Sequence, residues 1–403
     1  MRKYKSLFIT PFYKYQGDIN SPLNVLLIDS LDRLSIRSMI LTSHKCRTNS
    51  DSVLRVRYSC MWRVIIKISR IIAIPFKFDF LPDLFYWIWG KKAINTGVKY
   101  LKKNSIDFLH SISIPYSSHL VALKLKKKYN IPWIAHFYEP WCDNTYRKST
   151  PYVMKKNKEW ERLVVENADI IIHNSKRMCD SWLEKYGRLV EDKLAYLPMP
   201  LNVTGEKKEK KIGNKIIISH IGNLYGLRNS SIFLKALNEC LKDNITVREK
   251  LKINFIGKVS DVDIDTVKQL QLEGIVNFVG KLTEEECVEY YNNSDVFLVI
   301  EGQDQGPLFF PSKLIKYLYY ERPIIGITES GSVLDQLLIE NGHNSYTHDN
   351  IKGIADYIAK AVNSYDSLLS FKRDAWKEYE ISNVVEKYMS IVDKLLQINN
   401  NNN

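Results

Sequence analysis

The first third of the chain contains very little negative charge. Residues 1–130 hold 23 lysines and arginines against seven aspartates, and the first glutamate of the chain is Glu139. The segment therefore carries a net charge of +16, which exceeds the +13 of the whole 403-residue chain. A field of this sign and size favours a polyanion or an anionic membrane surface as a partner. A solvated basic face on a protein of basic composition is the alternative reading.

Long apolar runs and paired cysteines are also lacking. No stretch reaches the roughly 18 uninterrupted apolar residues that a spanning helix needs. The N-terminal MRKYKSLFITPFYKY has an apolar run of only about five residues, which predicts a first strand rather than a signal peptide. The six cysteines are scattered without a CxxC pair, which disfavours disulfides and a zinc site. We therefore expect a cytoplasmic protein with reduced thiols and no bound metal or cofactor.

Strand-like and helix-like segments alternate along most of the chain, which predicts parallel sheets with crossover helices. We expect two doubly wound, Rossmann-like α/β domains that face each other across a cleft. The first would span residues 1–200 and be completed by a C-terminal helix at 373–397. The second would span residues 201–372, with the polar segment 202–214 at the boundary. In such sheets, ligands lie at the carboxyl ends of the strands.

The expected elements can be given by residue range. In the first half we expect strands at 6–10, 38–42, 106–109, 133–136 and 169–173, with helices at 22–34, 117–129, 154–167 and 176–186. In the second half we expect strands at 215–220, 252–256, 275–279, 296–300 and 323–327. The helices of that half would lie at 230–241, 263–272, 284–291, 333–340 and 351–363, with a last amphipathic helix over about 367–397.

The stretch GPLFFPSKLIKYLYYERPIIG (306–326) carries the strongest functional signal. A strand at 296–300 leads through a glycine- and proline-containing loop into a helix that opens at Ser312 and Lys313. A serine at a helix start can cap free N–H groups, and the helix dipole favours an anion there. Lys313 adds a positive charge in the first turn. The loop is thus typical of a phosphate site, although an ordinary capped helix would give the same pattern.

A second cationic loop opens the second half of the chain. In ISHIGNLYGLRN (218–229) a strand ends near Gly222 and Asn223, and Arg228 stands where the next helix begins. Glycine lets a backbone approach a phosphate closely, and arginine can grip phosphate oxygens with two N–H groups. A diphosphate held between Arg228 and Lys313 is the resulting hypothesis. A surface arginine at a helix start is the alternative.

Two features of the first half face the same expected cleft. Gly17 lies in the loop after the first strand, where the backbone could pass under a ligand. His136 and Glu139 stand in HFYEPWCDN at the carboxyl end of a strand, so we interpret them as candidate catalytic residues. A single buried histidine can equally be structural.

Residues 58–92 interrupt the alternation. Arg63, Lys67 and Arg70 recur at helical spacing opposite an apolar side, and Trp87 and Trp89 follow. A basic amphipathic helix beside tryptophans is typical of a membrane interface and could also contact the acceptor. A core helix with one charged face is the alternative.

The order of these motifs resembles the GT-B glycosyltransferases of family 4. IGNLYGLRN (221–229), VNFVGKLTEEE (276–286) and PSKLIKYLYYERPIIG (311–326) are similar to the C-terminal half of that family. IPWIAHFYEPW (131–141) and LPDLFYW (81–87) resemble segments of one bacterial branch, PWIADFRDPW and Pro-Asp…Trp.

The resemblance implies a nucleotide-diphosphate sugar as donor, held mainly by the second domain and without an obligatory metal. Arg228 and Lys313 would neutralise the diphosphate, and the backbone around Lys281 would meet the base. Gly17 would lie under the sugar phosphate, and His136 would face the sugar. The acceptor would enter from the first domain, and the anomeric configuration would be retained.

Two departures from the family pattern concern carboxylates. The family often carries two glutamates eight positions apart, but Glu301 is followed at that spacing by Phe309. Lys316 occupies the position of a glutamate that usually contacts the ribose of the nucleotide. Glu301 is our candidate for making that contact instead. Near His136, tyrosine and glutamate stand where the branch has arginine and aspartate.

The sequence thus predicts a membrane-peripheral glycosyltransferase at the cytoplasmic face of the inner membrane. Its acceptor would be a lipid-linked saccharide in bacterial surface-polysaccharide assembly, O-antigen or capsule. The alternatives are a sugar-nucleotide epimerase of the same architecture and a non-catalytic protein that binds anionic lipid or nucleic acid. No recognised nucleic-acid-binding pattern is present, so we expect no nucleic-acid partner.

Overall fold

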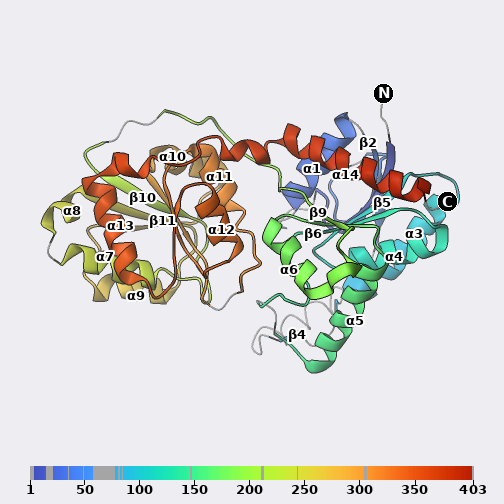
Figure 1. The fold of residues 1–403 in the computed structure, drawn as a ribbon, viewed down its shortest axis with the longest axis horizontal. Coiled ribbons are helices and arrows are strands. Elements are labelled where there is room, and N and C mark those ends of the chain that lie inside the picture. Colours follow the sequence, from blue (N-terminus) through green and yellow to red (C-terminus); the bar gives the residue numbers. More distant parts are fainter. Residues whose placement is uncertain are drawn as a thin grey trace. The chain divides into compact units, whose positions relative to one another are not determined.

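The chain forms two compact units (Figure 1). The computed structural model describes residues 4–14, 21–34, 36–48, 50–57, 78–79, 82–83, 85–145, 148–209, 213–242, 244–303 and 306–401. Unit 1 comprises residues 1–200 together with 379–403, and unit 2 comprises residues 201–378. The chain therefore leaves unit 1 once and returns to it at its C-terminal end.

Unit 1 is built on a parallel sheet whose strands run in the order β3-β2-β1-β5-β6-β8-β9. Its strands are β1 (Tyr4–Ile9), β2 (Ile36–Ser43), β3 (Val53–Val56), β5 (Phe108–Ile112), β6 (Trp133–Phe137), β8 (Ile170–His173) and β9 (Leu194–Tyr196). The central strands β5, β6 and β8 are buried along their whole length, as expected for a parallel sheet covered on both faces. A separate parallel pair joins β4 (Phe78–Asp79) to β7 (Lys148–Ser149).

Helices cover both faces of this sheet. One group packs together, namely the π-helical turn η1 (Tyr86–Gly90), α3 (Lys91–Leu101), α4 (Ser117–Tyr129) and α5 (Pro151–Asn167). The first helix, α1 (Ser21–Leu34), packs against the last, α14 (Ile381–Asn401). The sixth helix, α6 (Lys176–Tyr186), follows β8 and is capped by Ser175, whose side chain accepts from the Met178 N–H.

Unit 2 contains a parallel six-stranded sheet in the order β12-β11-β10-β13-β14-β15. The strands are β10 (Ile216–Ile221), β11 (Leu251–Ile256), β12 (Val276–Gly280), β13 (Val296–Ile300), β14 (Ile324–Ile327) and β15 (Asn344–Tyr346). The order reverses direction at β10 and β13, which lie side by side. This switch point is where ligands bind in doubly wound sheets.

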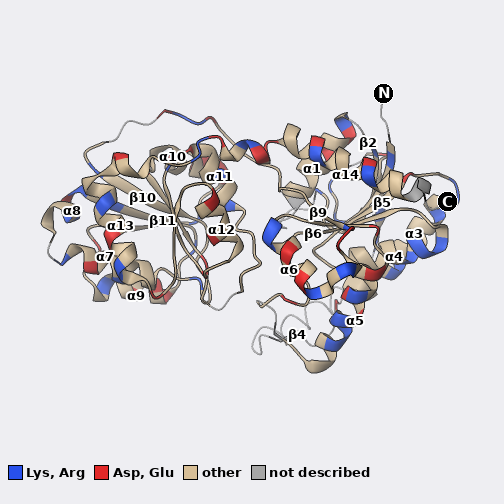
Figure 2. Cartoon of the chain, viewed as in Figure 1, with Lys and Arg blue, Asp and Glu red and all other residues tan. Residues whose placement is uncertain are grey.

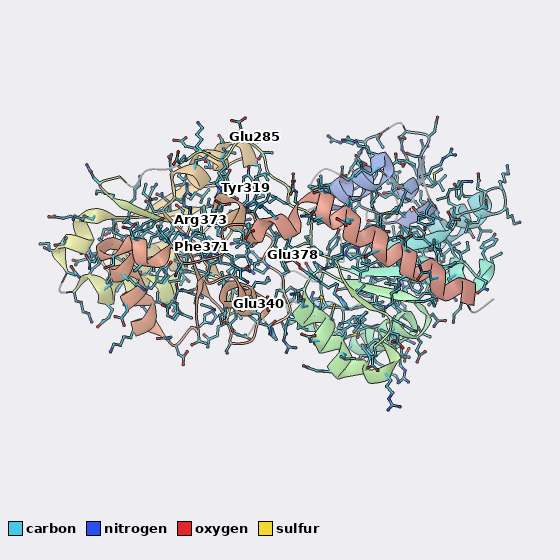
Figure 3. All side chains as sticks on the ribbon, turned by 45° about the horizontal axis from the view of Figure 1, so that its top comes forward. Glu285, Tyr319, Glu340, Phe371, Arg373 and Glu378 are labelled. Atoms are coloured by element: carbon cyan, nitrogen blue, oxygen red, sulfur yellow. The ribbon has the colours of Figure 1, made fainter. Side chains whose placement is uncertain are left out.

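The helices of unit 2 fall into two groups. Helices α7 (Ser231–Leu241), α8 (Ile245–Lys250), α9 (Asp261–Gln269) and α13 (Ile351–Asn363) pack against one another. Helices α10 (Glu284–Asn293) and α11 (Lys313–Tyr320) form a second packed pair, and α12 (Val333–Glu340) packs on β14 and β15. Phe371 and Arg373, labelled in Figure 3, lie on the segment that follows α13; the Phe371 ring packs 4.8 Å from His343.

The predicted fold class, two doubly wound α/β domains, is confirmed. The expected helices 117–129 and 176–186 have the observed bounds. The short elements β3, β9, β15 and α8 were not expected. The prediction of a continuous last helix from about 367 is wrong, because 3₁₀ turns occupy Tyr365–Leu368 and Ala375–Tyr379 and α14 begins at Ile381.

One buried carboxylate ties three elements of unit 1 together. Glu161 on α5 is 1% exposed. Its Oε2 accepts from the Cys142 N–H at 2.8 Å, and its Oε1 accepts from Lys185 at 2.7 Å and from the Tyr186 hydroxyl. The loop after β6 is thereby fixed to α5 and to the end of α6. Cys142 and Tyr186 are half-buried, so removing the carboxylate leaves two donors that water cannot readily satisfy.

We predict that Glu161→Ala destabilises unit 1 by about 1–3 kcal/mol, the cost of leaving the Cys142 N–H and the Tyr186 hydroxyl without an acceptor. Seven of the eight tryptophans lie in residues 1–200, so tryptophan fluorescence during urea unfolding follows this unit. The matched control is Arg162→Ala on the same helix, because the Arg162–Glu166 pair is exposed to solvent and should contribute little to stability. Equal midpoints for the two variants would refute the structural role of Glu161.

Candidate functional site

Three neighbouring strands of unit 2 end in glycines that have a positive φ. Gly222 follows β10 with φ +146°, Gly257 follows β11 with φ +127°, and Gly280 ends β12 with φ +87°. A Cβ on Gly257 would lie 2.5 Å from the Gly222 carbonyl oxygen, so the two backbones meet at a distance that no side chain permits. The carboxyl edge of the sheet is therefore lined by bare backbone.

Lys313, the first residue of α11, lies against this edge. Its Nζ is 3.0 Å from Nε2 of His220, which is on β10. A Cβ added to Gly222 would stand 2.8 Å from the same Nζ, so the ammonium lies directly over the strand end. The sequence predicted Gly222 and Lys313 from two separate motifs, and the structure brings them together.

The environment of Lys313 lowers the pKa of its ammonium to about 7. Burial is the main cause and the nearby charge of Arg228 adds to it, while Glu301 acts in the opposite direction. Within the described part of unit 2, Lys313 forms no ion pair with a carboxylate. A half-buried cation without a counter-ion is suited to an anionic ligand.

Arg228 stands in the loop between β10 and α7. Its guanidinium lies 5.3 Å from the centre of the exposed Tyr225 ring, and its backbone N–H donates to the Tyr225 carbonyl at 3.1 Å. The loop is anchored just beyond it. Ser230 donates to Oδ1 of Asp263 through both its N–H and its hydroxyl, each at 2.6 Å.

Asp263 is fully buried and was not found by sequence reasoning. Its other oxygen, Oδ2, accepts from the N–H and the hydroxyl of Ser260, completing a capping box at the start of α9. The same carboxylate thus fixes the starts of α7 and α9. The spacing of Ser260 and Asp263 matches a capping box, which could have pointed to Asp263 from the sequence. That spacing does not predict the hydrogen bonds from Ser230 to Asp263.

Glu301 follows β13 and is buried. Its Oε2 accepts a hydrogen bond from the Thr328 hydroxyl at 2.5 Å, and Thr328 is linked to Ser332 at 2.8 Å. Burial raises the pKa of Glu301 to about 7, although the Thr328 bond and the charges of Arg228 and Lys313 oppose this rise. Glu301 is therefore close enough to Arg228 and Lys313 for both charges to affect its pKa.

Three other predicted donor-binding residues of unit 2 have different surroundings. Ser312 is at the N-cap position of α11, but its exposed side chain makes no capping hydrogen bond, so the capping expectation is wrong. The Asn223 Oδ1 accepts from the Lys258 N–H at 2.9 Å, which ties the ends of β10 and β11 together. Lys281 is exposed just after β12.

Lys316 is one turn beyond Lys313 on α11. Its ammonium is paired with Glu284 at the start of α10. The cation that departs from the family pattern is therefore neutralised within the protein, unlike Lys313.

In unit 1, His136 is buried at the end of β6, and neither ring nitrogen has a hydrogen-bond partner among the residues that the structure describes. Burial lowers the pKa of its imidazole to about 3, so the ring is neutral at physiological pH. It packs against Tyr138, with ring centres 4.6 Å apart. Asn144 donates to Oε2 of Glu139 at 3.4 Å. His136 and Glu139 belong to unit 1, whereas Arg228 and Lys313 belong to unit 2.

The predicted membrane segment is described only in part. Arg63, Lys67, Arg70 and also Gly17 lie outside the described residues. Trp87 is 43% exposed, and the Lys91 ammonium is 4.3 Å from the centre of its ring. Trp89 is fully buried in the core of unit 1, so the expectation that it faces a membrane is wrong. No helix in the described ranges is long and apolar enough to cross a bilayer.

A cavity of about 580 Å³ in unit 1 lies at the amino ends of β1 and β2. Lys5, Arg37 and Tyr100 are among the residues that line it. It is at the opposite sheet edge from His136 and lies apart from the candidate residues. Among the residues that the structure describes, no group of three His, Cys, Asp or Glu side chains has the geometry of a metal site.

Residues 26–204 match the family model described as Glycosyltransferase Family 4. No curated protein sequence matches the chain.

Solved structures are similar over almost the whole chain. Sucrose-phosphate synthase from Thermosynechococcus elongatus has a TM-score of 0.66 at 13% identity, with 98% of this chain and 100% of that chain covered. HepE from Anabaena in complex with UDP-glucose has a TM-score of 0.64 at 11% identity, with 97% and 99% covered. The lipopolysaccharide outer core galactosyltransferase WaaB has a TM-score of 0.62 at 13% identity, with 96% and 99% covered. The structural matches establish the two-domain GT-B fold, and the family model covers most of unit 1. The chain thus has the GT-B fold, and residues 26–204 are similar to the family 4 glycosyltransferases.

Proposed function

We propose that this glycosyltransferase moves a sugar, with retention of configuration, from a nucleoside diphosphate sugar to a lipid-linked saccharide in bacterial surface-polysaccharide assembly. The observation that supports the donor most directly is Lys313, a half-buried ammonium near Arg228 at the switch point of the unit 2 sheet. The similar HepE structure holds UDP-glucose, so UDP-sugars are the first donors to test.

In this proposal the two cations stabilise charge that grows during the reaction. When the glycosidic bond breaks, the diphosphate gains negative charge, and Lys313 and Arg228 are positioned to stabilise it. His136, which is neutral, would offer hydrogen bonds to the sugar rather than a proton. The leaving diphosphate would help to deprotonate the acceptor hydroxyl, and no metal takes part.

The acceptor and membrane parts of the proposal rest on unit 1. Lysines lie along α3 and α4 (Figure 2). Trp87, in the turn just before α3, is exposed. Cationic side chains beside an exposed tryptophan favour an anionic membrane surface, which would bring the enzyme to a lipid-linked acceptor. The anomeric configuration of the product, read by NMR, distinguishes retention from inversion.

Two alternatives give different results in simple assays. A sugar-nucleotide epimerase would isomerise the donor in the absence of any acceptor. A nucleic-acid-binding protein would show a steep dependence of affinity on salt and no response to sugar nucleotides. The match to the glycosyltransferase family favours transfer over both.

We predict that Lys313→Ala and Arg228→Ala each weaken the binding of UDP-sugar about 10- to 100-fold, the loss expected for charge-assisted hydrogen bonds. Isothermal titration calorimetry over a panel of UDP-, GDP- and ADP-sugars measures this. Lys235→Ala on α7 is the control, because Lys235 is exposed in the same unit and should have no effect. Wild-type affinity in both site variants would refute the assignment.

We predict that donor affinity falls as the pH rises above about 7. The free Lys313 ammonium loses its proton through that range, because burial lowers its pKa, and only the charged form attracts a diphosphate. Binding should therefore take up protons, which calorimetry in buffers of different ionisation enthalpy detects. In Lys313→Arg the charge is permanent, so the fall above pH 7 should disappear; a persisting fall would assign it to another group.

We predict that the protein binds phosphatidylglycerol vesicles more tightly than phosphatidylcholine vesicles, and that Trp87→Ala weakens this binding at least about fivefold. Co-sedimentation measures both effects. Leu34→Ala is the control, because Leu34 is an exposed apolar residue on α1, outside the η1–α3 region. Equal binding to the two vesicle types would contradict the membrane proposal.

A further inference from the structure

His220 lies beneath the candidate phosphate site and was not found by sequence reasoning. It is fully buried on β10, two residues before Gly222. Its Nε2 is 3.0 Å from the Lys313 ammonium, and its Nδ1 is 3.0 Å from the Leu298 carbonyl oxygen on β13. The ring thus connects the neighbouring strand to the lysine.

The two contacts fix which nitrogen carries the hydrogen. The Leu298 carbonyl can only accept, so Nδ1 must be the donor in that contact. Burial and the charges of Lys313 and Arg228 hold the pKa of His220 well below its ordinary value, so the ring is neutral and has one hydrogen. Nε2 therefore has a free lone pair, and Lys313 donates to it.

A neutral acceptor has a different effect from a carboxylate. It satisfies one of the three N–H groups of the ammonium and fixes its position, yet it leaves the positive charge in place. The charge then remains available for an anion over the bare backbone of Gly222. By contrast, Lys316 on the same helix is neutralised by Glu284.

The other titratable groups around Lys313 do not replace this contact. Arg228 is a second cation, and Glu301 makes its hydrogen bond with Thr328. Tyr317 on α11 contacts the Ile221 N–H through its hydroxyl oxygen. Glu329 acts on Glu301 only through its charge.

We propose that His220 is a positioning residue that holds the Lys313 ammonium over Gly222 by accepting its hydrogen bond, and so keeps the positive charge free for the diphosphate of the donor. This inference deepens the proposed function and rests on it for the identity of the anion. The hold on Lys313 itself can be tested without any donor.

The test compares three variants that change one property at a time. His220→Gln retains an acceptor near the position of Nε2, His220→Glu adds a negative charge to nearly the same shape, and His220→Leu removes the acceptor. Circular dichroism and thermal unfolding identify any variant that fails to fold. The Gln and Glu variants are both polar and alike in size, so their comparison stands even if the Leu variant misfolds.

The first measurement is the pH dependence of Lys313 acylation by acetic anhydride in the free protein, followed by peptide mass spectrometry. We expect the midpoint to move down by about one pH unit in the Leu variant, up by a similar amount in the Glu variant, and little in the Gln variant. Unchanged midpoints in the Leu and Glu variants would overturn the proposal whether or not a nucleotide binds.

The second measurement is the affinity for UDP, with GDP and ADP in parallel, at pH 6.5, where Lys313 is charged in the wild type. We expect the Gln variant to bind within about threefold of wild type, and the Glu and Leu variants at least about tenfold more weakly. Equal affinity in the Gln and Glu variants would overturn the proposal. Failure of the wild type to bind any of the three nucleotides would refute the proposed donor site, while the acylation midpoints would still decide the role of His220.

Discussion

The close approach of backbone at the carboxyl ends of β10 and β11 is the constraint on which the site depends. Gly257 can lie against the Gly222 carbonyl only because Gly257 has no side chain. Gly222 in turn leaves room for the Lys313 ammonium, which rests on the strand end and donates to His220. A Cβ at position 222 would lie 2.8 Å from Nζ of Lys313, so a larger residue there would displace the lysine.

Hydrogen bonds within unit 2 hold the cationic loops in place before any ligand arrives. Asp263 fixes the start of α7, two residues after Arg228. Asn223 joins the end of β10 to Lys258, and the Tyr317 hydroxyl joins α11 to the Ile221 N–H. Both cations are therefore carried by loops that hydrogen bonds already anchor to the rest of unit 2. Because the loops are already ordered, little of the binding free energy of the ligand is lost to ordering the protein.

Much of the fold was predictable, because a parallel sheet with crossover helices leaves a regular pattern in the sequence. The helix at 117–129 was predicted with its observed bounds. Elements of three or four strand residues, such as β3 and β9, were missed, since so few residues show no periodicity. The 3₁₀ turns at Tyr365–Leu368 and Ala375–Tyr379 interrupt what looked like one amphipathic helix, and the chain passes from unit 2 back to unit 1 at this point. Only tertiary structure determines such a break.

The site was predictable where charge stands at a strand end, as for Arg228 and Lys313. It was not predictable where a residue acts through a neighbour. His220 is one of two polar residues in an otherwise apolar strand, and nothing in its flanking sequence indicates that Leu298 and Lys313 lie on either side of the ring. Ser312 shows the reverse error, because a serine at a helix start was expected to cap and does not.

The central claim is that Lys313 and Arg228 together hold the diphosphate of the donor. A crystal structure of the protein with bound UDP tests it most directly. We expect the diphosphate over Gly222, with its oxygens within hydrogen-bond distance of the Lys313 ammonium and the Arg228 guanidinium. A diphosphate bound elsewhere, with Lys313 still donating only to His220, would contradict this role of the two cations.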